Sequence, residues 1–167
     1  MSPQINKAVV QRLFDEFYPG NVDVADELFA PQVELNDSGK AMTVTPDDLK
    51  MRHRAQMATM PDMKMALHDV VSEGDTVAYR WTMSGTQTGA SGGIPATGKY
   101  GEMRGMTIMR LKDGRIVAGW HVYDMLGLLQ QLGVIPAQAL GRGGKEWVQH
   151  AVGWSGVTIR KGIRERH

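Results

Sequence analysis

Apolar and polar positions in the first third of the chain follow the 3.6-residue period of an α-helix. Apolar residues at helical spacing over residues 5–17 predict one amphipathic helix that ends before Pro19. A cap at Asn21 or Asp23 predicts a second, shorter helix that stops at Pro31. This part of the chain is therefore expected to be helical.

Two further segments follow before the pattern changes. Residues 33–35 are apolar enough only for a small edge strand. The capping hydroxyl of Thr45, with Pro46 and two carboxylates after it, predicts a helix start. This third helix is expected to run to about Met60 and to stop at Pro61.

From residue 63 onward the apolar positions recur every second residue, which is typical of strands. Strands are predicted over residues 63–71, 77–83, 100–111 and 116–124, with a glycine-rich loop at 85–98, a tight hairpin at 112–115 and a short helix at 125–132. Helices followed by hairpin-connected strands predict an α+β fold, with helices on one face of an antiparallel sheet. Residues 157–159 are expected to add a short strand.

The composition fits one globular domain. The chain has 167 residues, of which 42% are apolar and 22% charged. We expect a domain at residues 1–136 and a glycine-rich, basic extension at 137–167. No run approaches the roughly 20 apolar residues of a membrane span, and the first residues do not resemble a signal peptide, so a cytoplasmic location is expected. The absence of cysteine excludes disulfides and thiol catalysis.

The charge is unevenly distributed along the chain. The net charge is +1, but residues 141–167 carry +4, which leaves −3 for the rest. A basic tail could touch nucleic acid or a phosphate-bearing partner, although a solvated tail that aids solubility or subunit contacts is the favoured interpretation. Because the body of the chain is not basic, no nucleic-acid partner is expected.

The last predicted strand holds the first candidate for chemistry. Period-two geometry puts Ile116, Ala118, Trp120 and Val122 on one face, with Asp124 at its end. A carboxyl buried beside Trp120 favours its protonated form and suits a general acid or base. Asp124 also stands directly before the last helix, so it is equally well explained as that helix's N-cap.

Other potential sites carry weaker signals. His121 is predicted on the opposite face, where a structural role is favoured over that of a general base. The remaining histidines are scattered, so no metal site is expected. Serine-triad, phosphate-loop and dinucleotide patterns do not fit their structural contexts. Methionine is frequent, with five in residues 51–65 and others at 103, 106 and 109, and suits either a pocket lining for a flat ligand or core filling.

Several motifs together resemble one known family. The run Trp120–Gly133, WHVYDMLGLLQQLG, is similar to the closing motif of the SnoaL-like polyketide cyclases. Residues 94–99 and 110–117 resemble the loop and hairpin of that family, and Phe14-x-x-Phe17-Tyr18 and residues 28–33 resemble its opening. The resemblance covers residues 6–136 and leaves the tail outside the family pattern.

The resemblance implies a fold and an activity. The fold would be the cone of nuclear transport factor 2 (NTF2-like), with a homo-oligomer, dimer or tetramer, as the usual assembly. The activity would be an intramolecular aldol reaction that closes a ring of an anthracycline-type aromatic polyketide, without cofactor or metal. The partner would thus be a small aromatic or polyketide-like substrate. Asp124 would move the proton, and Asn36 and Tyr18 match positions that contact or place substrate.

One departure from the family keeps other activities open. The family places a histidine and a glutamine on the penultimate strand to bind substrate oxygens, whereas this chain has neither there. The candidate substrate-binding residues are therefore the following: Tyr18, Asn36, Arg104, Met106, Ile108, Arg110, Trp120 and His121. A hydroxylation component, an epoxide hydrolase, an isomerase or a non-catalytic binding module are alternatives on the same scaffold.

Overall fold

The structure is a computed structural model that describes residues 3–136. The extension at 137–167 and the strand expected at 157–159 lie outside the described residues. The helices are α1 (Pro3–Arg12), which continues as a π-helical turn (Leu13–Phe17), a 3₁₀ turn (Val22–Val24) that leads into α2 (Ala25–Leu28), α3 (Pro46–Thr59) and α4 (Met125–Gln131). The four helical regions expected from the sequence are therefore present.

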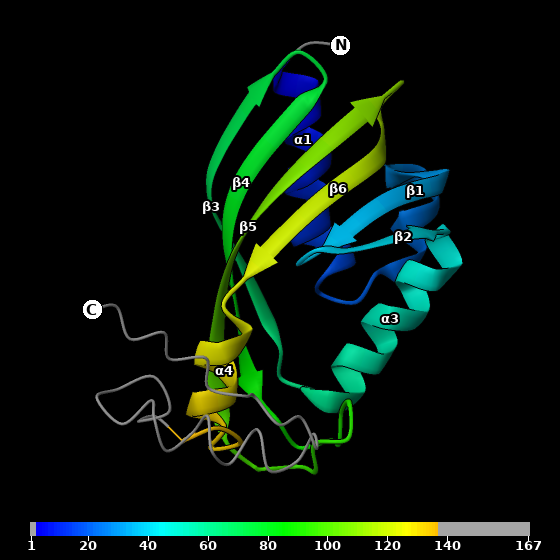
Figure 1. The fold of residues 1–167 in the computed structure, drawn as a ribbon. Coiled ribbons are helices and arrows are strands. Elements are labelled where there is room, and N and C mark those ends of the chain that lie inside the picture. The colour runs from blue at the N-terminus through cyan, green and yellow to red at the C-terminus, as the bar shows by residue number, and fades with distance from the viewer. Residues whose placement is uncertain (1–2, 137–167) are drawn as a thin grey trace, which may run out of the picture. The chain divides into compact units, whose positions relative to one another are not determined.

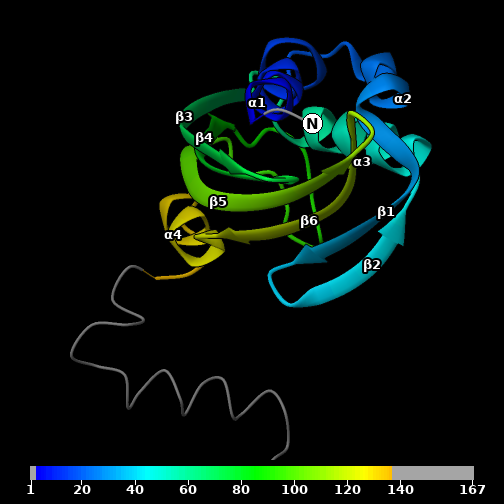
Figure 2. The same ribbon diagram turned by 90° about the horizontal axis from the view of Figure 1, so that it is seen from above.

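Six strands form one curved sheet, in the order β2-β1-β6-β5-β4-β3. Their bounds are β1 (Phe29–Asp37), β2 (Lys40–Val44), β3 (Lys64–Glu73), β4 (Thr76–Thr86), β5 (Tyr100–Lys112) and β6 (Arg115–Tyr123). All neighbours pair antiparallel except β1 and β6, which pair parallel. Figures 1 and 2 show β3–β6 curving around α1, with α3 beside β1. The predicted α+β fold is thus confirmed, with a curved sheet that is not closed and in which one pair of strands is parallel.

The helix starts follow from local chemistry. Thr45 accepts a hydrogen bond from the Asp48 amide, and the Asp48 carboxylate accepts one from the Thr45 amide, which makes the capping box of α3. Asn21 occupies the cap position before the 3₁₀ turn but makes no side-chain capping bond. Packing of Val24, Ala25 and Leu28 in the core holds this region instead.

The first strand differs from the sequence-based expectation. A short edge strand was expected at 33–35, but β1 has nine residues and pairs on both sides, with β2 and β6. Phe29, which was expected on the second helix, begins this strand. Pro31 is tolerated because the β1–β6 register is irregular between Phe29 and Glu34, so its missing N–H breaks no regular ladder. The strand β2 was not expected.

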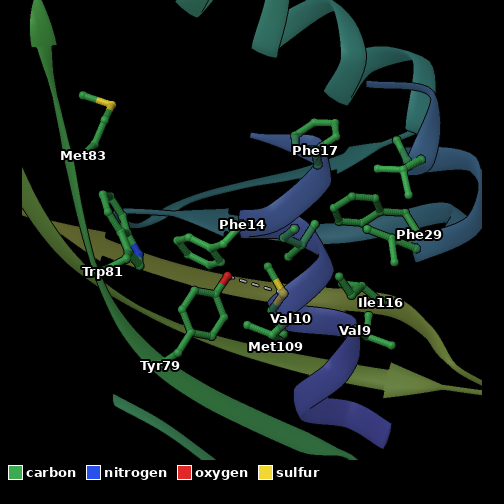
Figure 3. Close-up of a cluster of buried hydrophobic side chains, with 14 of the residues drawn as sticks. Val9, Val10, Phe14, Phe17, Phe29, Tyr79, Trp81, Met83, Met109 and Ile116 are labelled. Atoms are coloured by element: carbon green, nitrogen blue, oxygen red, sulfur yellow. Dashed lines mark hydrogen bonds between the residues drawn. The ribbon is translucent and has the colours of Figure 1, made fainter. Parts of the chain in front are cut away.

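The core fills the concave face of the sheet. Figure 3 shows Val9, Val10, Phe14 and Phe17 from the first helix packing against side chains of the strands, among them Tyr79, Trp81, Met109 and Ile116. Phe14 meets Tyr79 edge to face, with 5.7 Å between ring centroids. The amphipathic first helix therefore closes one side of the cone, as its apolar period predicted.

A bulge in β6 reverses which residues face this core. Arg110 on β5 pairs with Ala118, but Leu111 pairs with Ile116, so Val117 is an extra residue on β6. The expectation that Ile116, Ala118, Trp120, Val122 and Asp124 share one buried face is therefore wrong, because one inserted residue exchanges the two faces beyond it. Trp120 and Val122 lie on the exposed face, and His121 and Tyr123 lie on the helix-covered face.

Candidate functional site

An open pocket of about 600 Å³ lies between α3, α4 and the glycine-rich loop. Its floor is the cross-strand pair of Met83 on β4 and Met103 on β5. Met60 and Met125 also line it, and Leu128 and Leu129 of α4, with Leu132 directly after the helix, form one wall. Such a volume and such an apolar lining are typical of sites for small organic molecules.

Polar side chains enter this pocket from α3 and from the loop. Gln56 donates a hydrogen bond to Sδ of Met83 at 2.8 Å, and Arg52 lines the same wall. Gln87 is buried and ties the loop together, since it donates to the carbonyls of Gly89 and Pro95 and accepts the hydroxyl of Thr97 at 2.6 Å. The loop is therefore held in a defined shape at the pocket rim.

A row of side chains crosses four neighbouring strands on the concave face. Asp37 on β1 is the register partner of His121 on β6, which pairs with Thr107 on β5, which in turn pairs with Tyr79 on β4. Thr107 is only 1% exposed, whereas Asp37 and His121 are half-buried. This inner row places two ionisable groups and two hydroxyls side by side within the cone.

Hydrogen bonds join the inner row to Trp81. The Trp81 indole N–H donates to Oγ1 of Thr107 at 2.9 Å, and Nδ1 of His121 lies 3.0 Å from the same oxygen. Two glycines make room for these rings. A Cβ on Gly105 would lie 2.6 Å from Cε2 of Trp81, and one on Gly119 would lie 3.2 Å from Nε2 of His121.

The surroundings of the inner row shift its proton affinities. Burial lowers the pKa of His121, and the Asp37 carboxylate acts in the opposite direction with a smaller effect. Burial also raises the pKa of Tyr123, which the nearby Asp37 raises further. His121 is therefore neutral at pH 7, and the carboxylate of its register partner Asp37 would stabilise its protonated form.

A second buried imidazole lies nearer the first helix. His53 of α3 is 4% exposed, its ring centroid is 5.0 Å from that of Phe17, and its Nε2 has no hydrogen-bond partner among residues 3–136. Burial lowers the pKa of His53. The ring centroids of Tyr18 and Phe14 are 5.0 Å apart, and burial raises the pKa of Tyr18 to about 12. Tyr18 is thus a protonated phenol on the concave side.

Asp124, the predicted proton carrier, stands at the start of α4. Its Oδ1 accepts a hydrogen bond from the Gly127 amide at 2.8 Å, so it is the N-cap of this helix. The side chain is exposed, and it is not among the residues that line the pocket. The next residue, Met125, does line the pocket. The capping role that the sequence left open is therefore present in the structure.

Most of the other predicted substrate-binding residues lie on the exposed face of the sheet. Met106, Ile108 and Trp120 are 61%, 46% and 39% exposed, and Ile108 is the cross-strand partner of Trp120. The group also includes Arg110, which lies over the Trp120 ring at 5.4 Å, Arg104, which pairs with Glu102, and Asn36, which accepts the Gly39 amide in the β1–β2 turn. Of the predicted set, the structure brings only Tyr18 and His121 to the concave side.

The sequence-based reasoning missed several concave-side groups. Asp37 was overlooked because β1 was expected to end earlier, and Thr107 was not among the predicted substrate-binding residues. The buried ring of His53 gave no sequence signal beyond its helical position. Among the described residues, no cluster of three or more His, Asp or Glu could hold a metal ion. No helix in this part of the chain is long and apolar enough to cross a membrane.

The comparisons with known proteins agree with this architecture. The sequence profile of the SnoaL-like polyketide cyclases matches residues 8–132, so the chain belongs to that family. IdmH of Streptomyces antibioticus, provisionally described as a polyketide cyclase, is 29% identical over 77% of this chain and 98% of its own, with a TM-score of 0.68. No curated protein sequence matches the chain.

Two other solved structures show the range of the fold. A provisionally described polyketide cyclase of Acidithiobacillus ferrooxidans is 27% identical over 78% of this chain and 95% of its own, with a TM-score of 0.69. AclR of Streptomyces galilaeus, provisionally described as a hydroxylase, is 23% identical over 81% of this chain and all of its own, with a TM-score of 0.71. The latter likeness concerns the fold alone.

Proposed function

We propose that the protein is a cofactor-independent cyclase that closes a ring of an aromatic polyketide by an intramolecular aldol reaction. The observation that carries this proposal is the methionine-lined pocket of about 600 Å³, which has the size and the polarisable lining for a flat polycyclic ligand. Family membership supports a small-molecule substrate. Holding a flexible side chain folded in such a pocket supplies proximity, which is the main requirement of the reaction.

Asp124 is the proposed proton carrier. Its second carboxylate oxygen, Oδ2, makes no hydrogen bond in the described part of the chain, and its neighbour Met125 lines the pocket. A substrate that enters between α3 and α4 would bring its reacting side chain to this end of the cone. One carboxyl group there suffices to pass a proton to the alkoxide that forms as the ring closes.

The test uses an anthraquinone with an uncyclised β-keto ester side chain, incubated with purified protein without added cofactor. We expect an isomeric product of equal mass, resolved by chromatography and mass spectrometry, and we expect Asp124→Asn to lose it. Asparagine caps a helix nearly as well as aspartate, so folding is preserved while proton transfer is removed. No conversion by the wild type, or gain of one oxygen only after a reductase is added, would refute ring closure and indicate a hydroxylation component.

We also propose that the protein assembles as a homo-oligomer. Met106, Ile108, Trp120 and Val122 form an exposed apolar patch on the convex face, where Val122 is 68% exposed. Contiguous exposed apolar surface of this kind commonly marks an interface. Light scattering after size exclusion should give a dimer or tetramer for the wild type and a smaller species for Ile108→Lys. A wild-type monomer at all concentrations would exclude assembly.

A further inference from the structure

His121 is the ionisable group of the concave face whose reactive nitrogen is still available. Its Nε2 has no hydrogen-bond partner among residues 3–136 and keeps access to solvent, whereas Nδ1 is engaged with Thr107. The bulge at Val117 turns the ring inward, and Gly119 leaves the space in which it lies. The local structure thus directs this imidazole into the cone and fixes one of its two nitrogens.

The hydrogen bonds of Thr107 bear on the tautomer of His121. A threonine hydroxyl accepts two hydrogen bonds and donates one. The Trp81 N–H fills one lone pair of Oγ1, so one lone pair and the hydroxyl hydrogen remain for the contact with Nδ1 of His121. In the tautomer that carries its hydrogen on Nδ1, this N–H donates to the remaining lone pair of Oγ1, and Nε2 has the free lone pair of a base.

Asp37 supplies the charge that a proton-accepting histidine needs. It is the register partner of His121, and its Oδ1 is buried without a hydrogen-bond partner in the described part of the chain. The other titratable groups that face this region are Tyr79 of β4 and Tyr123 of β6, both of which stay neutral because burial raises their pKa. A proton taken up by His121 would therefore meet one uncompensated carboxylate.

We propose that His121, oriented by Thr107 and paired with Asp37, is a general base of this site and removes the proton from the carbon that forms the new bond. The assignment rests on the proposed ring closure for its substrate. Nε2 of His121 takes a proton from a carbon between two carbonyls, and the electron pair of the broken C–H bond is delocalised over the carbonyls as an enolate. The enolate carbon attacks the ketone, whose π electrons move to oxygen, and the alkoxide receives a proton from Asp124. The imidazolium and the Asp124 carboxylate then return to their starting states by proton exchange with solvent.

The first measurement needs no substrate. Nitrogen-15 spectra of the imidazoles report which ring nitrogen carries hydrogen. We expect the Nδ1–H form for His121 in the wild type and in Thr107→Ser, and a different tautomer balance in Thr107→Val, which removes the accepting oxygen. Asp37→Asn should make His121 harder to protonate. An Nε2–H form in the wild type, or titration of His121 unchanged by Asp37→Asn, overturns the assignment.

The second measurement follows carbon deprotonation separately from ring closure. In D₂O, the protein should speed exchange of the methylene hydrogens of the β-keto ester probe, and His121→Gln should lower this rate by about a hundredfold or more. His68→Gln, an exposed histidine that bonds to Thr82 on another strand, is the matched control and should retain the rate. Thermal unfolding of both variants checks that they are folded.

The outcomes separate the two proposals. Exchange that depends on His121 without any ring-closed product would support His121 as the base and refute the cyclase reaction. Ring closure by His121→Gln at the wild-type rate would refute the base and leave the cyclase intact. Absence of protein-dependent exchange in the wild type would refute the base.

Discussion

The methionine-lined pocket, called the mouth below, and the inner row lie on the same concave face, but their side chains differ in polarity and in flexibility. The mouth is lined by methionines and leucines, and Asp124, one residue before the pocket-lining Met125, is an exposed helix cap. The inner row consists of polar groups joined by hydrogen bonds between buried or half-buried side chains. Flexible thioethers adapt to the outline of a ligand, whereas a linked polar row holds one geometry. The difference fits the proposals that the mouth binds the substrate and that His121 of the inner row removes the proton from carbon.

Replacing one glycine by alanine in the inner row and one at the mouth should give the largest difference in stability. A Cβ on Gly105 would lie 2.6 Å and 2.8 Å from two atoms of the rigid Trp81 ring. We expect Gly105→Ala to lower the free energy of unfolding by about 3 kcal/mol, because the indole has no room to move. At the mouth, a Cβ on Gly101 meets the flexible end of Leu128 at 2.6 Å, so Gly101→Ala should cost about 1 kcal/mol. Urea unfolding measures both, and equal losses would show that the mouth is as tightly packed as the inner row.

Substitutions at Asp124 should have a moderate effect on stability. Removal of the cap in Asp124→Ala is expected to cost about 1 kcal/mol, because the Gly127 amide loses its acceptor. Asp124→Asn keeps an acceptor oxygen and should cost only a few tenths of a kcal/mol. The same urea experiment compares the two variants. A large loss in Asp124→Asn would mean that the charge itself holds this end of the cone.

The smallest expected effect is a pH dependence of stability that comes from two histidines of the interior. Burial lowers the pKa of His53 and of His121 below the ordinary value of 6.5, so the unfolded chain binds more protons than the folded one in mild acid. Stability should therefore fall as the pH drops below about 6.5, and this decline should end below the folded-state pKa values. Melting temperatures across this range should fall less for His53→Phe than for the wild type. A parallel decline in both would exclude His53 as a contributor.

The sequence predicted the elements with strong local signals. The capping residues of α3 and the two-residue period of β4 were read correctly, because each depends on neighbouring residues only. The faces of β6 could not be predicted, since the extra residue at Val117 is set by pairing with β5 and leaves no mark in the local pattern. Asp37 was missed for a related reason, because β1 is stabilised by partners distant in the sequence.

The candidate site was therefore predicted in part. His121 and Tyr18 were named and lie on the concave side, whereas Trp120, Met106 and Ile108 lie on the exposed face of the sheet. Asp124 was given two interpretations, and the structure contains the capping one. The role of Asp124 in proton transfer stays a prediction until the variant is assayed.

The parallel pairing of β1 with β6 bears on the order in which the molecule assembles. The antiparallel strands β3–β6 are joined by short connections or by one loop, so each can pair with the next in order along the chain. In contrast, β1 pairs with a strand more than 80 residues away in the sequence. Contacts of such separation are closed late, because the intervening chain loses much entropy when they form. His121 and Thr107 would thus be paired before Asp37 of β1 comes to lie beside them. Late pairing of β1 would then also complete the inner row of the site, because it brings Asp37 beside His121.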